Sequence, residues 1–314
     1  MKLGLLVDPL HTLKHETDTT LAFIARACEM GFTCYYFTVH DLFSRHGRSF
    51  ARVSSISVDA RDPSKIQTAV VGDEPLGEFD VILMRKDPPF NMEYIYATYL
   101  LELAEGEGVI IANSPQSLRD ANEKFLTLYA PNCCPSTLVT QDRARLQAFW
   151  EEHREVVFKP LDGMGGRDVF YVGEDGRNLS VILEQLTHMG SVMIVAQAFI
   201  KEIAETGDKR ILIIDGEPVP YGLARFAKKG EFRCNLAAGG QGKVVPITER
   251  ERFICTEIAP LLRAKKLSFV GIDVIGGYLT EINVTSPACL VEITKETGID
   301  IAGDYLRYLA GLLC

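Results

Sequence analysis

The sequence contains no apolar run approaching the roughly 20 residues that a helix needs to cross a membrane. Its first residues are apolar, but Asp8 and Pro9 interrupt them before they reach the length of a signal peptide. We therefore expect a cytoplasmic protein. An excess of basic residues is also missing, because 33 lysines and arginines stand against 42 acidic residues, for a net charge of -9. Without a basic surface, nucleic acid is a poor candidate for a partner.

Signals for several kinds of catalytic or metal site are missing too. None of the eight cysteines forms a Cys-x-x-Cys pair and most have apolar neighbours, so we expect small buried residues in a reducing compartment. His11 and His15 have the spacing of a zinc pair on a helix, but no glutamate follows His11. There is also no Gly-x-Ser-x-Gly motif. These absences argue against a disulfide scaffold, a zinc enzyme and a serine hydrolase.

What is present is an ordinary globular composition, with 47% hydrophobic and 24% charged residues in a chain of 314. That length allows two or three packed units. Up to about residue 120, short apolar runs alternate with helical patterns, which is typical of an α/β domain with a mostly parallel sheet. Beyond that point strands come in pairs joined by short turns, with helices between the pairs. The expected fold class is therefore α/β, with an N-terminal α/β domain followed by two α+β lobes.

A glycine-rich loop follows a strand that delivers a lysine. Lys159 ends the run 156–159, and Gly163, Gly165 and Gly166 come directly afterwards. Lysine is a compact cation suited to phosphate, and glycine lets backbone N–H groups approach an anion closely. Because the lysine precedes the glycines, the segment is neither a P-loop nor a Rossmann fingerprint. On its own it leaves phosphate binding and a plain turn equally open.

Three polar side chains interrupt the apolar hairpin expected at 269–284. Side chains alternate faces along a strand, so Glu281 and Asn283 share one face. Asp273 joins them only if it pairs across with Glu281. That pairing requires an odd loop such as 276–278, because a two-residue Gly-Gly turn would place the two acids on opposite faces. Three hard oxygen ligands on one face suit Mg²⁺ bridged to nucleotide phosphates, whereas two solvated acids on an edge strand are the alternative.

Arginines recur around a segment with the composition of a mobile loop. Arg210, Arg225 and Arg233 lie before, at the start of and inside residues 225–242, which are rich in glycine and charge. Guanidinium groups suit carboxylates and transferring phosphoryl groups. The plainer interpretation of any single arginine is a surface ion pair that contributes little.

Together these segments resemble a known family. The chain is similar to the bacterial glutathione synthetases, which belong to the ATP-grasp superfamily. The resemblance runs from the first strand to about residue 295 and is weak after Glu296. It is carried by five blocks: 80–90 (DVILMRKDPPF), 159–166 (KPLDGMGG), 215–221 (DGEPVPY), 235–240 (NLAAGG) and 280–287 (TEINVTSP).

The resemblance implies a reaction, a fold and partners. The reaction joins γ-glutamylcysteine and glycine into glutathione through an acyl-phosphate, and it turns ATP into ADP and phosphate. ATP is then a co-substrate and Mg²⁺, or Mn²⁺, the metal. The implied ATP-grasp fold has an N-terminal domain over residues 1–121, a first lobe over 122–200 and a second lobe with the metal hairpin over 201–314. Family members commonly form homo-tetramers, and neither nucleic acid nor membrane is an expected partner.

The resemblance also assigns roles to residues. Asp273, Glu281 and Asn283 are expected to hold the metal, and Arg210, Arg225 and Arg233 to act in catalysis. The substrate residues are Arg85, Arg225, Arg233 and Ser286. The expected ATP-binding residues are Lys124, Lys159, Gly163, Gly165, Gly166, Gln197, Ile200, Asp208 and Asn283, of which Gln197 to Ile200 form the adenine hinge.

Two other functions remain open from the sequence. An enzyme of the same fold that joins another acceptor amine would differ in the substrate pocket and not in the metal hairpin. A non-catalytic nucleotide-binding module should lack some of the metal or arginine residues, yet Asp273, Glu281, Asn283 and Arg210 are all present.

Overall fold

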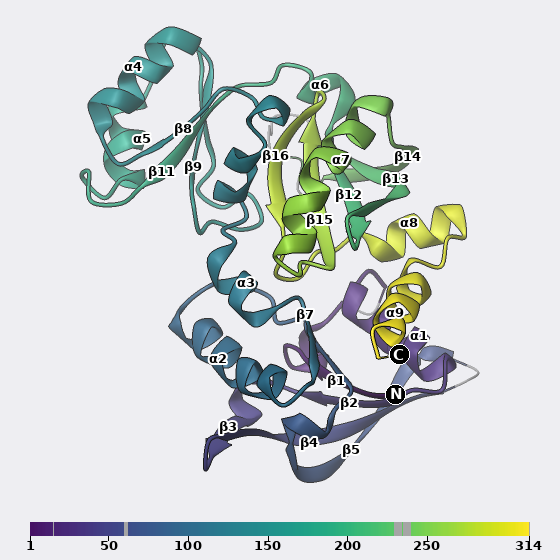
Figure 1. Ribbon diagram of the computed structural model, residues 1–314. Helices are drawn as coiled ribbons and strands as arrows, with labels where there is room; N and C mark the ends of the chain where they lie inside the picture. The colour runs from purple at the N-terminus through teal and green to yellow at the C-terminus, as the bar shows by residue number, and fades with distance from the viewer. Residues whose placement is uncertain (15, 60–61, 229–233, 235–239, 314) are drawn as a thin grey trace.

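The computed structural model describes residues 1–14, 16–59, 62–228, 234 and 240–313. A lower domain built on one sheet carries an upper body that contains two further sheets (Figure 1). Among the described residues no helix is both long and apolar enough to span a bilayer. The seven described cysteines form no disulfide with one another, and five of them are buried, as expected of small core residues.

The lower domain is an α/β unit whose central strands are parallel. The order in its sheet is β3-β4-β2-β1-β6-β7, with β5 paired to β4, and the pairs β1·β2, β1·β6 and β6·β7 are parallel. This confirms the predicted alternation of strands and helices. The strands are β1 (Lys2–Leu6), β2 (Thr33–Phe37), β3 (Leu42–Arg45), β4 (Arg48–Asp59), β5 (Asp62–Pro75), β6 (Val81–Met84) and β7 (Ile110–Ala112).

Helices cover both faces of this sheet, and side chains cap the two longest. α1 (Thr19–Glu29) begins at Asp18, whose carboxylate accepts from the amides of Thr20 and Leu21 at 2.7 and 3.2 Å. α2 (Met92–Gly106) begins at Asn91, whose side chain accepts from the amide of Tyr94. The remaining helix of the domain is α3 (Pro115–Asp120), and the short 3₁₀ turns of the chain are η1 (Leu10–Thr12), η2 (Val39–Asp41), η3 (Leu76–Glu78), η4 (Phe125–Tyr129) and η5 (Pro131–Cys133).

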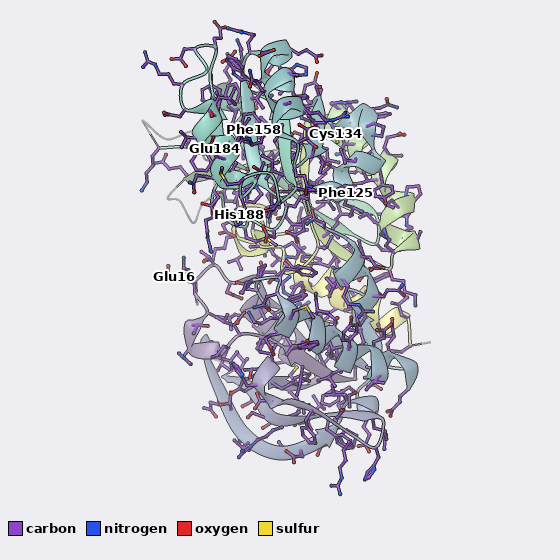
Figure 2. All side chains as sticks on the ribbon, turned by 90° about the vertical axis from the view of Figure 1, so that its left-hand side faces the viewer. Glu16, Phe125, Cys134, Phe158, Glu184 and His188 are labelled. Carbon is purple, nitrogen blue, oxygen red and sulfur yellow. The ribbon has the colours of Figure 1, made fainter. Side chains whose placement is uncertain are left out.

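The first lobe of the upper body is an antiparallel sheet covered by two helices. Its order is β10-β9-β11-β8, and its apolar face packs on α4 (Arg143–His153) and α5 (Leu179–Leu186). Phe158, labelled in Figure 2, is fully buried in that core. The strands are β8 (Thr137–Thr140), β9 (Val156–Pro160), β10 (Phe170–Val172) and β11 (Ile194–Ala198).

The second lobe is also antiparallel, in the order β14-β13-β12-β15-β16. α7 (Glu249–Ala264) packs on it and carries a capping box between Thr248 and Glu251. The other elements of the lobe are α6 (Ile203–Thr206), β12 (Asp208–Ile214), β13 (Glu217–Phe226), β14 (Gln241–Pro246), β15 (Phe269–Ile275) and β16 (Tyr278–Asn283).

The end of the chain returns to the lower domain. α8 (Leu290–Thr297) and α9 (Ile301–Gly311) lie beside α1 (Figure 1). Phe23 of α1, Phe269 of β15 and Tyr305 of α9 form a buried triangle with ring centroids 4.9–5.5 Å apart, and Arg26 pairs with Asp300 at 2.8 Å. The lower domain and the second lobe therefore share part of their apolar core.

Candidate active site

A cavity lies between the sheets of the two lobes. Its empty space is about 860 Å³, counting the open mouth. β9, β11 and the segment after β11 form one wall, and β12, β15 and β16 form the other. The cavity brings together residues that are up to 157 positions apart in the sequence, including these predicted site residues: Lys124, Lys159, Gly163, Gly165, Gly166, Gln197, Ile200, Asp208, Asp273 and Glu281.

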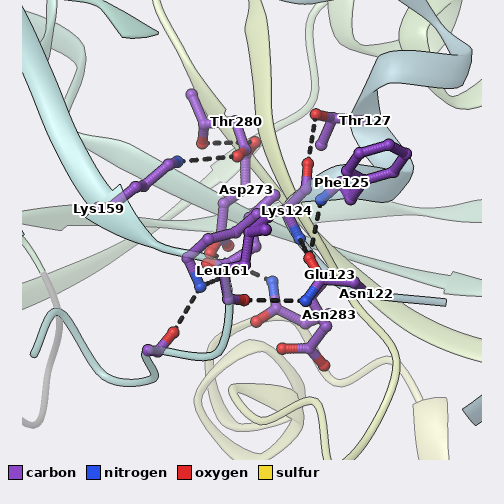
Figure 3. A network of polar contacts seen from close by, with 12 residues as sticks. Asn122, Glu123, Lys124, Phe125, Thr127, Lys159, Leu161, Asp273, Thr280 and Asn283 are labelled. Atoms are coloured by element: carbon purple, nitrogen blue, oxygen red, sulfur yellow. Dashed lines mark hydrogen bonds and ion pairs between the residues drawn. The ribbon is translucent and has the colours of Figure 1, made fainter. Parts of the chain in front are cut away.

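Two lysines reach the far wall of the cavity. Lys159 of β9 is buried, and its Nζ donates to the carbonyl of Thr280 at 3.2 Å. Burial lowers the pKa of Lys159 to about 8, because a charged ammonium is disfavoured away from water. The Nζ of Lys124 donates to Glu281 Oε1 at 2.8 Å and to the carbonyl of Gly163 (Figure 3). Two lysine ammonium groups therefore lie in the cavity beside the glycine loop.

The backbone conformation of the loop 163–166 requires glycine at three positions. Gly165 and Gly166 have φ angles of 65° and 77°, in the left-handed region that other residues enter at a cost. A side chain on Gly163 would meet the ring of Pro160 at 2.5 Å. The loop therefore brings bare backbone to the edge of the cavity, as a phosphate site requires.

The hairpin places Asp273 and Glu281 directly opposite each other, and hence on one face. The expected odd loop was wrong. Gly276 and Gly277 form a two-residue turn between Ile275 and Tyr278, with φ angles of 56° and 81°. A β-bulge between the pairs Val274–Leu279 and Asp273–Glu281 inserts Thr280 as the extra residue, and this restores the register.

Asp273 is the centre of a buried ion-pair network. Arg210 Nε and Nη2 donate to its two oxygens at 2.6 and 3.0 Å, and Arg225 Nη2 lies 2.9 Å from Oδ1. Burial opposes ionisation, but the two guanidinium groups outweigh it and hold the pKa of Asp273 well below its usual range. Arg225 also binds Asp208 Oδ2 at 2.5 Å, while burial raises the pKa of Asp208 to about 6.

The donors on this face fit a hard divalent cation. The described residues contain no cluster of three His, Cys, Asp or Glu side chains that could enclose a metal by themselves. They offer two carboxylates and an amide, because Asn283 Nδ2 donates to Asp273 Oδ2 at 3.2 Å and lies on the same face. Such a set suits an ion that takes its remaining oxygens from nucleotide phosphates.

Two of the predicted substrate residues lie apart from this cavity, at the joint with the lower domain. Arg85 follows β6 and is buried, with its guanidinium 5.7 and 5.9 Å from the rings of Phe23 and Phe269. Its Nη2 donates to the carbonyl of Pro287 at 3.0 Å, and Ser286 Oγ lies 3.5 Å from the carbonyl of Arg85. Within the described part of the chain, Arg85 Nη1 is buried without a hydrogen-bond partner.

Four further predicted site residues do not line the cavity or are not described. Arg233 lies outside the described residues, as does His15 of the histidine pair. Asn283 is not among the side chains that line the cavity, although it contacts Asp273. Arg210 and Arg225 likewise lie behind the lining and reach the site through Asp273.

Sequence reasoning missed Glu123. Its Oε1 accepts from the amides of Val284 and Thr285 at 2.7 and 3.0 Å and from the Thr285 hydroxyl at 3.0 Å. Its carbonyl accepts from the amide of Ile282. Glu123 therefore fixes Lys124 beside β16 (Figure 3). The local sequence offered no signal, because a lone acid in a segment without periodicity is indistinguishable from a surface residue.

Comparisons with known proteins identify the family of this chain. Residues 1–119 match the family described as prokaryotic glutathione synthetase, N-terminal domain, and residues 123–306 match its ATP-grasp domain. The glutathione synthetase of Pseudomonas putida is 49% identical over 304 residues, covering 96% of this chain and 95% of that protein. That of Escherichia coli O127:H6 is 47% identical over 303 residues, 96% of each chain.

Solved structures share the fold at low sequence identity. D-cycloserine synthetase DcsG aligns with a TM-score of 0.70 at 15% identity, over 99% of this chain and all of that one. The ATP-grasp ligase PsnB, in complex with a precursor peptide, aligns with a TM-score of 0.64 at 15% identity, over 99% and 97% of the two chains. The ATP-grasp fold expected from the sequence is confirmed, and the chain belongs to the prokaryotic glutathione synthetase family.

Proposed function

We propose that this protein joins γ-glutamylcysteine to glycine at the expense of ATP, producing glutathione, ADP and phosphate. Family membership supports the reaction. The observation that supports it in this chain is the placement of Asp273 and Glu281 on one face, opposite Lys124 and Lys159, in a single cavity. Two acids for a metal and two lysines for phosphates are the parts that phosphoryl transfer requires.

ATP is proposed to occupy the cavity between the lobes. Its adenine would lie against the segment from Gln197 to Ile200, which includes the last two residues of β11 and lines the cavity. Its phosphates would meet Lys124, Lys159 and the amides of Gly163, Gly165 and Gly166. Asp208 and Asn283 would lie near the nucleotide, where Asp208 has one buried oxygen without a hydrogen-bond partner among the described groups.

Asp273, Glu281 and Asn283 are proposed to hold Mg²⁺, or Mn²⁺ in its place. When bound, the ion neutralises charge on the phosphates and polarises the γ-phosphoryl group. The protein's own part is to keep Asp273 ionised and to hold the Glu281 side chain in position. Arg210 and Arg225 do so for Asp273, and Lys124 holds Glu281 in place.

The proposed chemistry has two steps. The cysteinyl carboxylate of the dipeptide attacks the γ-phosphorus, forms an acyl-phosphate and expels ADP. The amine of glycine then attacks the acyl carbon, loses a proton and expels phosphate. Arg210, Arg225 and Arg233 are proposed to stabilise the charge on the transferring group and on the developing oxyanion. Arg85 and Ser286, with Arg225 and Arg233, are proposed to bind the peptide and glycine carboxylates.

The proposal also covers the domain boundaries, the location of the protein and its assembly. The domains divide at 1–121, 122–200 and 201–314, although α8 and α9 of the last range pack against α1. The protein acts in the cytoplasm on small molecules, without nucleic acid or membrane. It assembles as a homo-oligomer, with a tetramer as the expected state.

Phosphate release tests the proposed function. With ATP, Mg²⁺ and γ-glutamylcysteine, release should be slow until glycine is added, and should then match the amount of glutathione formed. Alanine, serine and β-alanine as acceptors separate this reaction from that of another ligase with the same fold. Equal release with and without glycine, or faster turnover with another amine, contradicts the proposal.

A further inference from the structure

Two thiols of the lower domain lie next to each other where α1 ends. Cys28 belongs to the last turn of α1, and Cys34 is the second residue of β2. Their side chains interact directly, and this contact is the largest influence on the pKa of each thiol. Cys34 is only 2% exposed, whereas Cys28 is partly exposed. The pair therefore has one thiol that a small molecule can reach and one that lies behind it.

The backbone between α1 and β2 holds the two thiols in place. The amide of Gly31 donates to the carbonyl of Cys28, and the amide of Phe32 donates to the carbonyl of Ala27, both at 3.0 Å. Gly31 has a φ angle of 76°, so the segment is a Schellman motif that ends the helix and turns the chain directly into β2. The fold thus brings Cys28 and Cys34 together before any reagent arrives.

The two thiols differ in acidity in the sense that a disulfide exchange needs. Contact with Cys34 and a backbone hydrogen bond with Val58 outweigh burial and hold the pKa of Cys28 below its usual value. Contact with Cys28 and burial both raise the pKa of Cys34, whose Sγ donates to the carbonyl of Phe32 at 3.7 Å. Because the thiolate is the nucleophile, Cys28 is the attacking thiol and Cys34 the resolving one.

We propose that Cys28 and Cys34 form a reversible disulfide by exchange with a low-molecular-weight disulfide. The thiolate of Cys28 attacks one sulfur of the small disulfide, and its sulfur–sulfur bond breaks to release the first small thiolate, which takes up a proton. Cys34 then loses its proton and attacks Sγ of Cys28 in the mixed disulfide, which releases the second small thiolate. The protein loses two electrons, and the small disulfide is reduced to two thiols.

Such a bond would be easily reversed. It closes a loop of only a few residues, so it constrains the unfolded chain little and adds little stability. Neither cysteine lines the cavity between the lobes. The exchange is therefore independent of the proposed reaction. Its link to the protein's own product rests on the proposed function, because oxidised glutathione is a disulfide of this class.

Peptide mapping of the full-length protein is the first test. The reduced protein is treated with oxidised glutathione or with bis(2-hydroxyethyl) disulfide, unfolded in the presence of N-ethylmaleimide and digested with trypsin. The peptide 27–45 contains both cysteines. It should be two hydrogens lighter than the dithiol and free of maleimide after either reagent, and dithiothreitol should restore the dithiol.

The same digest contains its own control. The peptide 125–143 carries the adjacent Cys133 and Cys134, whose pKa values are raised by burial, and it should take up two maleimides throughout. Two maleimides on 27–45 after both reagents, or a mixed disulfide that persists in the native protein, overturns the proposal. Glutathione synthesis is assayed separately, so either result can fail while the other stands.

Single variants test the order of attack. Cys34→Ala should stop at a stable mixed disulfide on Cys28, since the resolving thiol is missing. Cys28→Ala should leave Cys34 unmodified, because that thiol is buried and protonated. A mixed disulfide on Cys34 in Cys28→Ala, formed as fast as the one on Cys28 in Cys34→Ala, overturns the assigned roles. The mapping of the native protein stands even if a variant does not fold.

Discussion

Asp273 shows how the protein keeps a buried acid ionised. Removing a carboxylate from water normally favours its neutral form, but Arg210 and Arg225 lie within 2.6 and 2.9 Å of its oxygens. The energetic margin of such a buried network is small, since desolvation of three charges offsets most of the attraction. Its value is therefore in holding a fixed negative oxygen at one point, as a metal site needs.

Glu281 is the residue that best separates binding from chemistry. Glu281→Gln keeps the shape of the side chain but removes its charge, so we expect turnover to fall about a hundredfold or more while ATP still binds. Steady-state turnover and ATP affinity are measured together. Glu217→Gln, at an exposed ion pair with Arg263, is the matched control and should behave as the native protein. Near-native turnover in Glu281→Gln would remove this residue from the proposed metal site.

The lowered pKa of Lys159 predicts that ATP binding depends on pH. Burial lowers its pKa to about 8, so in the free protein it loses its charge as the pH rises above 8. Phosphate favours the charged form, and bound ATP should raise the pKa of Lys159. Binding above pH 8 is therefore expected to take up a proton, and ATP affinity should fall from pH 8 to 9.5, where ATP itself no longer titrates.

Calorimetry in two buffers of different ionisation enthalpy measures this proton uptake directly. Lys159→Met should abolish the uptake and weaken binding, whereas Lys243→Met, on β14 outside the cavity, should change neither. An affinity that stays constant from pH 7 to 9.5 would contradict the assignment of Lys159 to the phosphates.

At the scale of elements, the hairpin of β15 and β16 shows what its sequence did and did not predict. The alternation of apolar and polar residues predicted both strands and the shared face of Glu281 and Asn283. The turn length was wrong, because Gly276-Gly277 is a two-residue turn and the bulge at Thr280 corrects the register. The sequence around Thr280 contains no residue that signals a bulge. The bulge is therefore seen only in the register of the structure, where Asp273 pairs with Glu281.

In the rest of the chain, too, regular patterns predicted elements and irregular segments were missed. The helical patterns expected between the strands are present, and α7 is the clearest case, because its apolar residues recur at helical spacing over 16 residues. The hairpin of β4 and β5 was missed, since serines and charges interrupt its alternation. In the site, the glycine loop and the acids within apolar strands could be recognised from the local sequence. Glu123 could not, because its partners are backbone amides 161 and 162 positions away.

The Gly276-Gly277 turn between β15 and β16 allows two substitutions that can be compared directly. Both glycines have positive φ angles, so Gly276→Ala and Gly277→Ala should each lower the free energy of unfolding by at least about 1 kcal/mol, and Gly276→Ala by more. A Cβ on Gly276 would lie 2.8 Å from Cγ2 of Ile200, whereas one on Gly277 meets only Arg250 at 3.1 Å. Only Gly276→Ala should therefore raise KM for ATP. Urea unfolding and ATP kinetics check this, and equal KM values for the two variants would speak against Ile200 as part of the hinge.

At the scale of the whole molecule, Asn113 joins the lower domain to the hairpin of β15 and β16. Following β7, its Nδ2 donates to the carbonyls of Phe269 and Val284, both at 2.8 Å, and its Oδ1 accepts from the amide of Phe269 at 3.0 Å. One buried side chain thus holds the start of β15 and the residue after β16. The site and the lower domain are coupled through this joint.

Asn113→Asp tests the joint by exchanging one nitrogen for oxygen. Two buried carbonyls lose their donor, so we expect a loss of at least about 2 kcal/mol in the free energy of unfolding. Denaturant unfolding measures it, and Asn132→Asp at an exposed position provides the comparison. If the two variants are equally stable, the joint does not hold the domains together.

The central claim is that ATP is spent on an acyl-phosphate of the dipeptide, and oxygen transfer tests it most directly. γ-Glutamylcysteine carrying ¹⁸O in both oxygens of its cysteinyl carboxylate is turned over with ATP and glycine, and the phosphate is analysed by mass spectrometry. Attack of this carboxylate on the γ-phosphorus predicts one ¹⁸O in each phosphate released and one retained in the new amide. Unlabelled phosphate, or ¹⁸O in AMP, would contradict the mechanism.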